Sequence, residues 1–167
     1  MPKHTISAED ARQLLSYNPE TGTFTWRVGR RGTARVGSVA GRPNGRGYFQ
    51  IRIYGRRYCA HRLAWLLTHE VWPENQIDHI NGRRDDNRLC NLRLATRSEN
   101  TRNAKRRSDN TSGFKGVGFH KAQGKWRARI KIDGRRKDLG RFDTPEEAHA
   151  AYCKAAAELH GEFANFG

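Results

Sequence analysis

The sequence has few cysteines and no long apolar segment, and each shortage excludes a class of protein. Three cysteines, Cys59, Cys90 and Cys153, stand far apart in 167 residues. That number and spacing exclude a disulfide framework and a Cys-x-x-Cys zinc site, and they predict a reducing, cytoplasmic environment. No run of about eighteen apolar residues occurs, so we expect no transmembrane helix. The first five residues lack the apolar core of a signal peptide, so we do not expect secretion.

Acidic residues are also scarce. The chain has 17 Asp and Glu against 32 Lys and Arg, a net charge of +15. Such an excess predicts a polyanionic partner, either nucleic acid or an acidic membrane, with a merely solubilising surface as the alternative. Membrane binding requires a basic amphipathic helix with a large apolar face, and the sequence has no such segment. The 16 aromatic residues argue against disorder. Nucleic acid is therefore the favoured partner.

The basic charge is unevenly distributed. Residues 113–141 hold ten basic and two acidic residues, whereas residues 142–167 hold one and five. One element is therefore basic and the next acidic. This division is expected if the basic element binds the partner and the acidic element packs behind it. A polar linker follows the basic run that ends at Arg107. We expect an N-terminal strand-rich region, a core region, this linker and a C-terminal domain, at residues 1–57, 58–107, 108–112 and 113–167.

Apolar periodicity predicts a mixed α+β fold. Ser7 begins a short helix over residues 8–15, and a second helix, over residues 61–70, ends before Pro73. Alternation predicts strands near Trp26 and over residues 48–54, with a Gly- and Arg-rich loop between them. Three more strands are expected at residues 114–120, 125–132 and 136–142, with a hairpin turn at Asp133-Gly134. Thr96-Arg-Ser-Glu99 is a capping box that begins a helix containing Asn100. Thr144-Pro-Glu-Glu147 is another capping box, and it begins an amphipathic helix. The C-terminal region is thus expected to be a three-stranded antiparallel sheet packed on one helix.

A group of polar residues follows the short apolar strand at residues 77–80. Asp78 and His79 interrupt this strand, a polar loop over residues 81–88 follows, and a strand resumes at Asn91. Hydrolysis of a phosphodiester needs a base for water and a cation for the developing charge. A neutral His supplies a base near pH 7, and Asp and Asn oxygens suit a cation such as Mg²⁺. Adjacent strand residues point to opposite faces, so Asp78 and His79 share a site only at a strand end or distortion. The alternative to a catalytic site is an ordinary turn in which the His is hydrogen-bonded.

Several separated motifs resemble the HNH nucleases, in the branch carried by phages and mobile introns. They are Pro19-Glu-Thr-Gly22, Trp26, Tyr58-Cys-Ala-His-Arg-Leu-Ala-Trp65, Ile77-Asp-His-Ile-Asn-Gly82, Asn87-Arg88, Asn91-Leu-Arg93, Ala95-Thr96 and Asn100-x-x-Asn103. This resemblance implies a ββα-metal (His-Me finger) module with His79 as general base and Asn91 bracing the loop. It implies one divalent metal ion, Mg²⁺ or Mn²⁺, at Asp78 and Asn100. Asn100 replaces the second His of many members, and the zinc-binding cysteine pairs of some members are absent, so we expect no zinc site.

The strand at residues 125–132 alternates basic and apolar residues. Trp126, Ala128, Ile130 and Ile132 should face the helix, which leaves a basic row of Lys125, Arg127, Arg129 and Lys131. A small sheet fits a DNA major groove, where Arg and Lys contact phosphates and guanine edges. We predict that DNA is contacted by this row together with Lys115, Arg135 and Arg136.

A second resemblance covers residues 113–167. Phe114-Lys-Gly-Val-Gly118, Lys125-Trp126, Leu139-Gly-Arg-Phe142 and Thr144-x-Glu-Glu-Ala148-x-x-Ala-Tyr152 resemble the ethylene-response-factor (APETALA-type) DNA-binding domain of plants. Ala155-Ala156 and residues 161–166 continue the match. In that family the sheet enters the groove. Gly118 and Asp138 depart from its usual Arg and Trp, so base preference does not transfer.

The two resemblances together predict a metal-dependent DNA endonuclease of the homing type. Double-stranded DNA is the expected partner, and no membrane or protein partner is implied. The alternative is a non-catalytic DNA-binding protein or regulator with a decayed nuclease site. An RNA-binding role is weaker, because no aromatic platform for single strands is evident.

Overall fold

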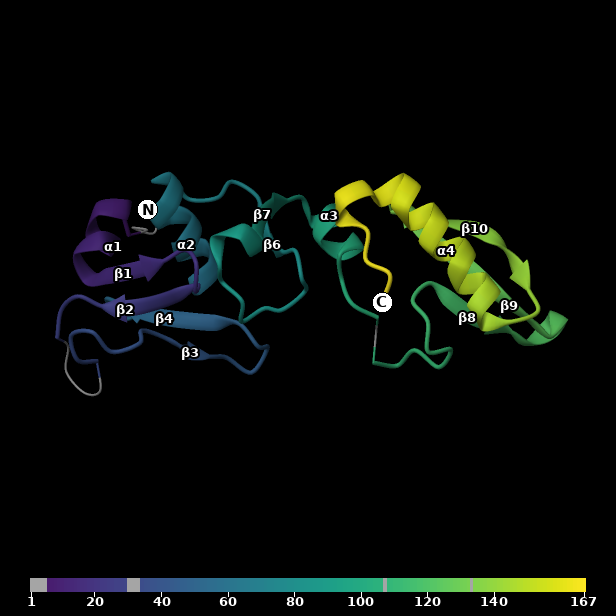
Figure 1. Cartoon of the computed structure of the whole chain (residues 1–167), viewed down its shortest axis with the longest axis horizontal. Helices are drawn as coiled ribbons and strands as arrows, with labels where there is room; N and C mark the ends of the chain where they lie inside the picture. The colour runs from purple at the N-terminus through teal and green to yellow at the C-terminus, as the bar shows by residue number, and fades with distance from the viewer. Residues whose placement is uncertain (1–5, 30–33, 107, 133) are drawn as a thin grey trace. The chain divides into compact units, whose positions relative to one another are not determined.

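The computed structural model describes residues 6–29, 34–106, 108–132 and 134–167, and these form two compact units. The first unit ends at Leu94 and the second begins at Ala95 (Figure 1). The expected turn residue Asp133 lies outside the described residues. No helix among the described residues is long and apolar enough to cross a membrane.

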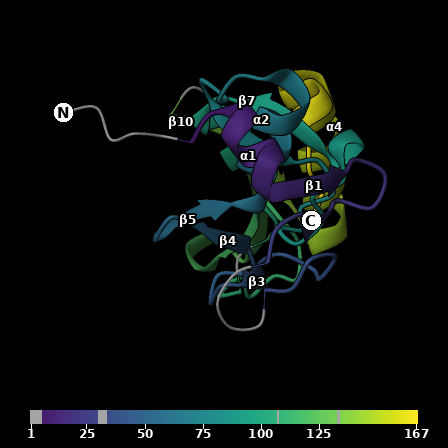
Figure 2. The same ribbon diagram turned by 90° about the vertical axis from the view of Figure 1, so that its left-hand side faces the viewer.

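The first unit begins with a helix and a hairpin. Helix α1 (Ala8–Leu14) begins at Ser7, whose side chain accepts a hydrogen bond from the Asp10 amide as expected. Strand β1 (Leu15–Asn18) follows directly and pairs antiparallel with β2 (Thr23–Trp26). The sequence pattern predicted β2 but not β1. Figure 2 shows α1 beside α2 (Ala60–His69), a contact that closes this end of the core.

A three-stranded antiparallel sheet completes the support for α2. It contains β3 (Arg42–Pro43), β4 (Phe49–Ile53) and β5 (Arg56–Cys59) in the order β3-β4-β5. Ile51 and Ile53 are fully buried under α2, where they meet Leu63 and Leu66. The predicted strand at residues 48–54 and the helix at residues 61–70 are confirmed within one residue at each end.

A second, smaller pairing follows α2. Strand β6 (Gln76–His79) pairs with β7 (Leu92–Ala95), and a loop and a 3₁₀ turn (Leu89–Asn91) connect them. Ile77 and Leu92 are buried in the same core as α2. The polar loop of residues 81–88 is therefore attached to the core at both of its ends.

The second unit contains a short helix and the expected sheet. Helix α3 (Arg97–Arg102) begins with the predicted capping box of Thr96 and Glu99. Strands β8 (Val117–His120), β9 (Lys125–Ile132) and β10 (Arg135–Phe142) form an antiparallel sheet in the order β10-β9-β8. A 3₁₀ turn (Lys121–Gln123) connects β8 to β9. The sheet prediction is confirmed, although β8 is shorter than expected.

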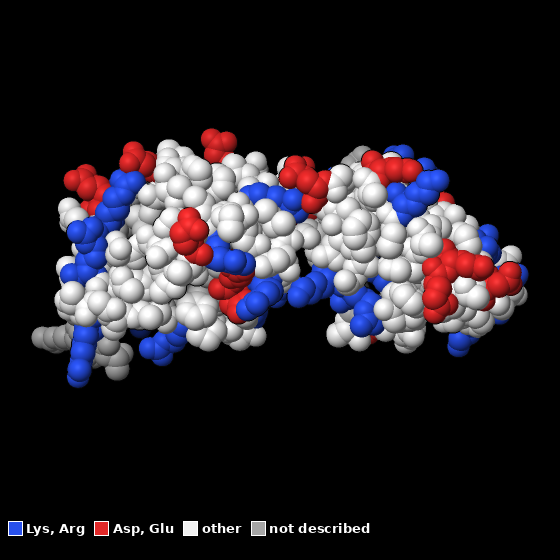
Figure 3. All heavy atoms as spheres, viewed as in Figure 1, with Lys and Arg blue, Asp and Glu red and all other residues white. Residues whose placement is uncertain are grey.

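Helix α4 (Pro145–His160) packs on the apolar face of this sheet and ends in a 3₁₀ turn (Gly161–Phe163). Its predicted capping box is present, and Ala148, Tyr152 and Ala156 are buried against Ala128 and Ile130. Acidic side chains gather over the N-terminal part of α4 in Figure 3, in line with the charge division seen in the sequence.

The division between the units differs from the expected linker at residues 108–112. The C-terminal segment attaches α3 to the second unit, because the Asn165 side-chain amide donates to the Asn103 carbonyl at 3.0 Å. The Lys115 ammonium also donates to the Arg102 and Ala104 carbonyls at 2.9 and 2.6 Å. These bonds depend on long-range folding that local composition does not encode. The functional division at residues 108–112 stays a prediction.

Candidate functional site

Asp78 and His79 lie at the end of β6, where the chain turns into the polar loop. Both are buried, with 3% and 5% of their surfaces exposed. As expected for neighbouring strand residues, their contacts differ. Asp78 forms an ion pair with Arg93, whereas the ring of His79 meets His61 and Tyr48 with centroids 5.0 and 6.0 Å apart. A buried carboxylate and a buried imidazole therefore end the same strand.

The environment of His79 favours its neutral form. Burial lowers the pKa of His79, and the Asn87 side chain and the Asp78 and Asp86 carboxylates only partly oppose this effect. A neutral imidazole has a lone pair that accepts a proton, which a charged imidazolium lacks. His79 is thus suited to act as a base near pH 7.

Arg93 fixes the orientation of Asp78. Its Nε and Nη2 atoms donate to the same carboxylate oxygen, Oδ2, at 3.0 and 2.9 Å. The Arg93 side chain comes from β7 and is only 13% exposed, so the pair is largely shielded from water. Because charge-assisted hydrogen bonds of this kind are short and strong, the carboxylate is held in one position.

The candidate metal ligands stand on different units. Asp78 offers a carboxylate, a hard oxygen donor of the kind that Mg²⁺ accepts with only one or two protein ligands. Asn100 lies on α3 in the second unit, where its amide continues the helix by donating to the Thr96 carbonyl. Within the described ranges no cluster of three or more His, Cys, Asp or Glu residues is present. The assignment of one cation to Asp78 and Asn100 stays a prediction.

Asn91 connects the two ends of the polar loop. Its side-chain oxygen accepts from the Asn81 amide at 3.0 Å, and its side-chain nitrogen donates to the Asp86 carbonyl at 2.8 Å. The Ile80 amide donates to the Asn91 carbonyl at 2.9 Å, which continues the pairing beyond His79. This geometry suits the predicted role of Asn91 in bracing the loop.

The β1–β2 hairpin supports the same loop from outside. The Tyr17 hydroxyl donates to the Asn87 carbonyl at 2.8 Å, and the Leu89 amide donates to the Pro19 carbonyl at 3.0 Å. Gly22 has φ +72°, and a Cβ placed there would lie 2.5 Å from the Arg88 nitrogen. The Pro19-Glu-Thr-Gly22 segment is therefore packed directly on the loop.

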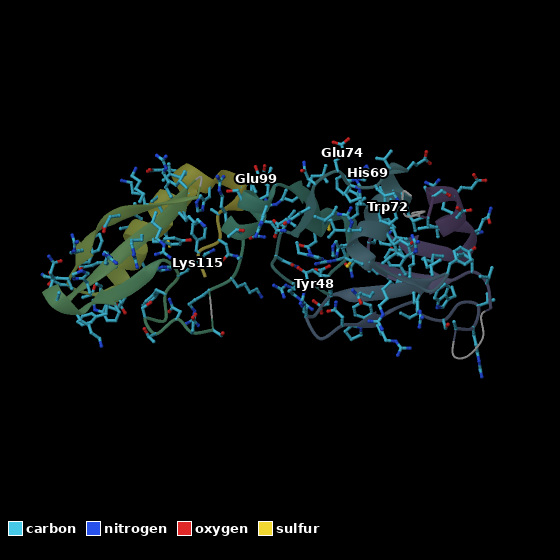
Figure 4. The ribbon with its side chains drawn as sticks, turned by 180° about the vertical axis from the view of Figure 1, so that it is seen from behind. Tyr48, His69, Trp72, Glu74, Glu99 and Lys115 are labelled. Atoms are coloured by element: carbon cyan, nitrogen blue, oxygen red, sulfur yellow. The ribbon has the colours of Figure 1, made fainter. Side chains whose placement is uncertain are left out.

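Three residues beside the site were not predicted from the sequence. His61 of α2 packs on His79, Tyr48 (labelled in Figure 4) packs on both rings, and the Arg84 guanidinium lies 5.0 Å from the centre of the Tyr48 ring. His61 stands within the Tyr58–Trp65 motif, which was the available signal for it. Tyr48 and Arg84 carry no local signal, because their neighbours come from distant segments.

The basic row on β9 is less uniform than its sequence suggested. Lys125 pairs with Asp143, and Arg127 lies 4.0 Å from the Asp138 carboxylate. Asp138 is also the register partner of Arg129 on β10. Cross-strand register therefore brings a carboxylate beside the row. A DNA-binding role for the row stays a prediction.

The remaining predicted DNA contacts differ in exposure. Arg135 and Arg136 are exposed on β10, and Arg136 is paired in register with Lys131. Lys115 is half-buried, and burial lowers the pKa of its ammonium to about 8. Its bonds to the Arg102 and Ala104 carbonyls give it a structural role beside the predicted one.

Two parts of the chain match known families. Residues 58–102 match the HNH endonuclease family, and residues 112–162 match the AP2 domain. Both matches agree with the resemblances found in the sequence. Together they point to a nuclease that binds DNA, in a family whose members generally use a divalent metal.

Two viral proteins are similar to the chain. "Uncharacterized HNH endonuclease L560" of Acanthamoeba polyphaga mimivirus is 31% identical over 106 residues, which are 62% of this chain and 54% of that protein. This chain therefore spans about half the length of that relative. "Protein 3.8" of Escherichia phage T7 is 39% identical over 107 residues, or 64% of this chain and 88% of the phage protein. No solved structure matches. The chain belongs to the family of phage T7 Protein 3.8, with an HNH endonuclease match in its middle region and an AP2 domain match at its C-terminal end.

Proposed function

We propose that this chain is a metal-dependent DNA endonuclease that hydrolyses phosphodiester bonds with His79 as general base. The observation that carries the proposal is a buried imidazole with a lowered pKa, beside a buried carboxylate, at the end of β6. That strand lies inside the segment that matches HNH endonucleases. A phage relative further supports action in the cytoplasm of an infected cell.

The chain's own residues would divide the work. His79 would take a proton from the attacking water, which a neutral imidazole is able to do near pH 7. Asn91 would keep the loop beside His79 in place through its two bonds to Asn81 and Asp86. Arg93 would keep Asp78 aligned through its paired hydrogen bonds. Each role follows from a contact within the first unit.

Asp78 and Asn100 would hold one divalent cation, Mg²⁺ or Mn²⁺, in a ββα-metal arrangement. Such a cation, when bound, stabilises charge on the scissile phosphate and on the departing oxygen. The buried carboxylate of Asp78, already fixed by Arg93, is a suitable oxygen donor. The Asn100 amide oxygen is the second donor proposed, and water would complete the shell.

The C-terminal sheet would hold the DNA. Lys125, Arg127, Arg129 and Lys131 lie on the side of β9 opposite the buried Ala128 and Ile130, and Arg135 and Arg136 are exposed on β10. The AP2 match over residues 112–162 supports this assignment. Contacts to phosphates would position the duplex, and any contacts to base edges would set the sequence preference.

Incubation with supercoiled plasmid tests the proposal. With Mg²⁺ or Mn²⁺ we expect nicked or linear product, and with EDTA we expect none. A chain that binds plasmid under both conditions but never cuts it would instead be a non-catalytic DNA-binding protein with a decayed nuclease site. Full activity in EDTA would contradict the metal assignment alone.

A further inference from the structure

Arg84 of the polar loop is held near His79 by the turn between β3 and β4, residues 44–48 of the same unit. Its guanidinium lies 5.0 Å from the centre of the Tyr48 ring, and its Nη1 atom donates to the Arg46 carbonyl at 3.1 Å. The Tyr48 ring also meets the ring of His79, with centroids 6.0 Å apart. A guanidinium that stacks on a ring and donates to a carbonyl is restricted in its motion. A positive charge is therefore held close to the proposed general base.

The turn that holds Arg84 is fixed by its own hydrogen bonds. The Asn44 side-chain oxygen accepts from the Arg46 and Tyr48 amides at 2.9 and 3.0 Å. The Asn44 amide donates to the Tyr48 carbonyl at 2.8 Å, and Gly47 takes the positive φ of +81° that the turn requires. Because both contacts of Arg84 are to this turn, its guanidinium is positioned by the backbone next to the β3–β4 pair.

Arg84 differs from its neighbours in the loop in what it contacts. The Arg83 guanidinium pairs with Asp85, and that of Arg88 pairs with Asp86. Arg84 instead contacts an aromatic face and a backbone carbonyl, and both of these groups are uncharged. These contacts fix the direction of the side chain without adding a negative charge to it.

The charge of Arg84 acts at the candidate site. Burial lowers the pKa of His79, and the positive charge of Arg84 lowers it further. Arg84 is also exposed, so a ligand that comes from solvent is able to reach its guanidinium. A phosphate that approaches the His79 ring would therefore be attracted by Arg84.

We propose that Arg84 is a further catalytic residue, whose guanidinium binds the scissile phosphate of the DNA. The inference rests on the proposed function, because the phosphate is the one that is hydrolysed. As His79 takes a proton from water, the water oxygen bonds to phosphorus and the bond to the departing oxygen breaks. Negative charge then gathers on the phosphate oxygens and on the departing oxygen. A planar guanidinium already fixed in place donates to such oxygens without the cost of reorganisation.

Cleavage of plasmid by the full chain at saturating protein tests this role. Arg84→Ala should lower the rate by about 10²–10³-fold, as does removal of one donor to the developing charge in other enzymes. Arg83→Ala is the matched control, because it removes an adjacent and exposed positive charge that pairs with Asp85. Its rate should stay within about three-fold of the wild type. Equal rates for the two variants would overturn the proposal.

The alternative is that Arg84 only links the loop to the turn. Arg84→Met keeps a long side chain against Tyr48 but has no charge, so it should be as slow as Arg84→Ala. Low millimolar guanidinium should restore part of the rate to Arg84→Ala and none to His79→Ala, because the free ion replaces a charge and not a base. Wild-type cleavage by Arg84→Met would show that the side chain has only the linking role.

Binding to a short duplex in EDTA separates this inference from the nuclease proposal. Loss of one phosphate contact lowers the slope of log affinity against log salt concentration by about 0.9. Arg84→Ala should show this change, and Arg83→Ala should show less than about half of it. If the wild type cuts no plasmid, the nuclease proposal fails, whereas the lower slope of Arg84→Ala would still support the phosphate contact. Equal slopes for Arg84→Ala and the wild type would overturn that contact.

Discussion

The imidazole ring of His61 lies edge-on to that of His79, with ring centroids 5.0 Å apart and ring planes at 80°. His61 comes from α2 and His79 from the end of β6, and both are buried. Burial, assisted by His79 and by the charge of Arg62, lowers the pKa of His61 to about 3. Both rings are therefore neutral in the native state near pH 7.

This pair predicts that acid destabilises the first unit. The pKa of His61 is about 3 in the folded chain against an ordinary value of 6.5, so the unfolded state binds more protons between these values. The free energy of unfolding should therefore fall as the pH falls through that window. His61 alone should contribute a loss of about 2–3 kcal/mol between pH 7.5 and 4.5. Urea unfolding at both pH values measures it.

The variant His61→Leu provides the control for this effect. Leucine has no proton to gain, so the variant should lose less stability between the two pH values than the wild type. The difference between the two losses isolates His61 from the carboxylates, which also titrate near pH 4.5. An identical loss in both proteins would mean that His61 is already protonated or exposed in the native state.

Removal of His79 should abolish cleavage but not binding. A general base contributes about 10²–10⁴-fold to the rate, so His79→Ala should lose that much plasmid cleavage. Affinity for duplex should stay within about two-fold, because the predicted DNA contacts lie on other residues. His69→Ala is the matched control, since His69 is an exposed histidine at the end of α2. Cleavage by His79→Ala at the wild-type rate would refute its role.

The side chain of Asn91 should matter to the loop more than to the core. Asn91→Ala leaves the Asn81 amide and the Asp86 carbonyl without their partner, at a cost of about 1–3 kcal/mol in unfolding free energy. Cleavage should fall with it, while DNA affinity should not. The exposed Asn75→Ala is the control for loss of an amide side chain. Equal stability of the two variants would show that the bridge contributes nothing.

Local patterns predicted the elements whose signals lie within a few residues of sequence. The capping boxes at Thr96 and Thr144 fix helix starts through side chains three residues apart, and both are present. The alternation from Lys125 to Ile132 gave the bounds of β9 correctly. Strand β1 was missed because it has only four residues and follows α1 without a turn, so its pairing with β2 is its main signal.

The surroundings of the site depend on contacts that no short segment contains. Arg93 reaches Asp78 across fifteen residues, and the Tyr17 hydroxyl reaches Asn87 across seventy. Asp138 approaches the basic row only because β10 pairs with β9, with a register shift between Asp138 and Gly140. Residue types and order therefore suggested the chemistry, whereas the partners of each group required the folded chain.

Because Gly22 packs closely on the loop, a side chain added at this position should lower the stability of the protein more than one added at an open glycine. Gly22→Ala adds a Cβ about 2.5 Å from the Arg88 nitrogen and also strains a backbone with positive φ. Gly37→Ala is a matched control, because Gly37 has φ +79° but no atom within 4 Å of its added Cβ. The strain alone costs about 1–2 kcal/mol, so Gly22→Ala should destabilise by more than that and should reduce cleavage. Equal melting temperatures for both variants would argue against direct packing of the hairpin on the loop.

The position of Asp138 beside the basic row predicts that its removal strengthens DNA binding. Its carboxylate lies 4.0 Å from Arg127 and is 45% exposed. Asp138→Asn removes this charge but keeps a side-chain oxygen to accept from the Gly140 amide, so the local backbone should be unchanged. Exposed ion pairs contribute about 0.2–1 kcal/mol, which corresponds to an affinity about 1.4- to 5-fold tighter at low salt.

Glu158→Gln, an exposed change on α4, is the control for net charge. Fluorescence anisotropy with a short duplex measures both variants. If both tighten binding equally, the gain reflects total charge, and the sheet face has no special part in holding DNA.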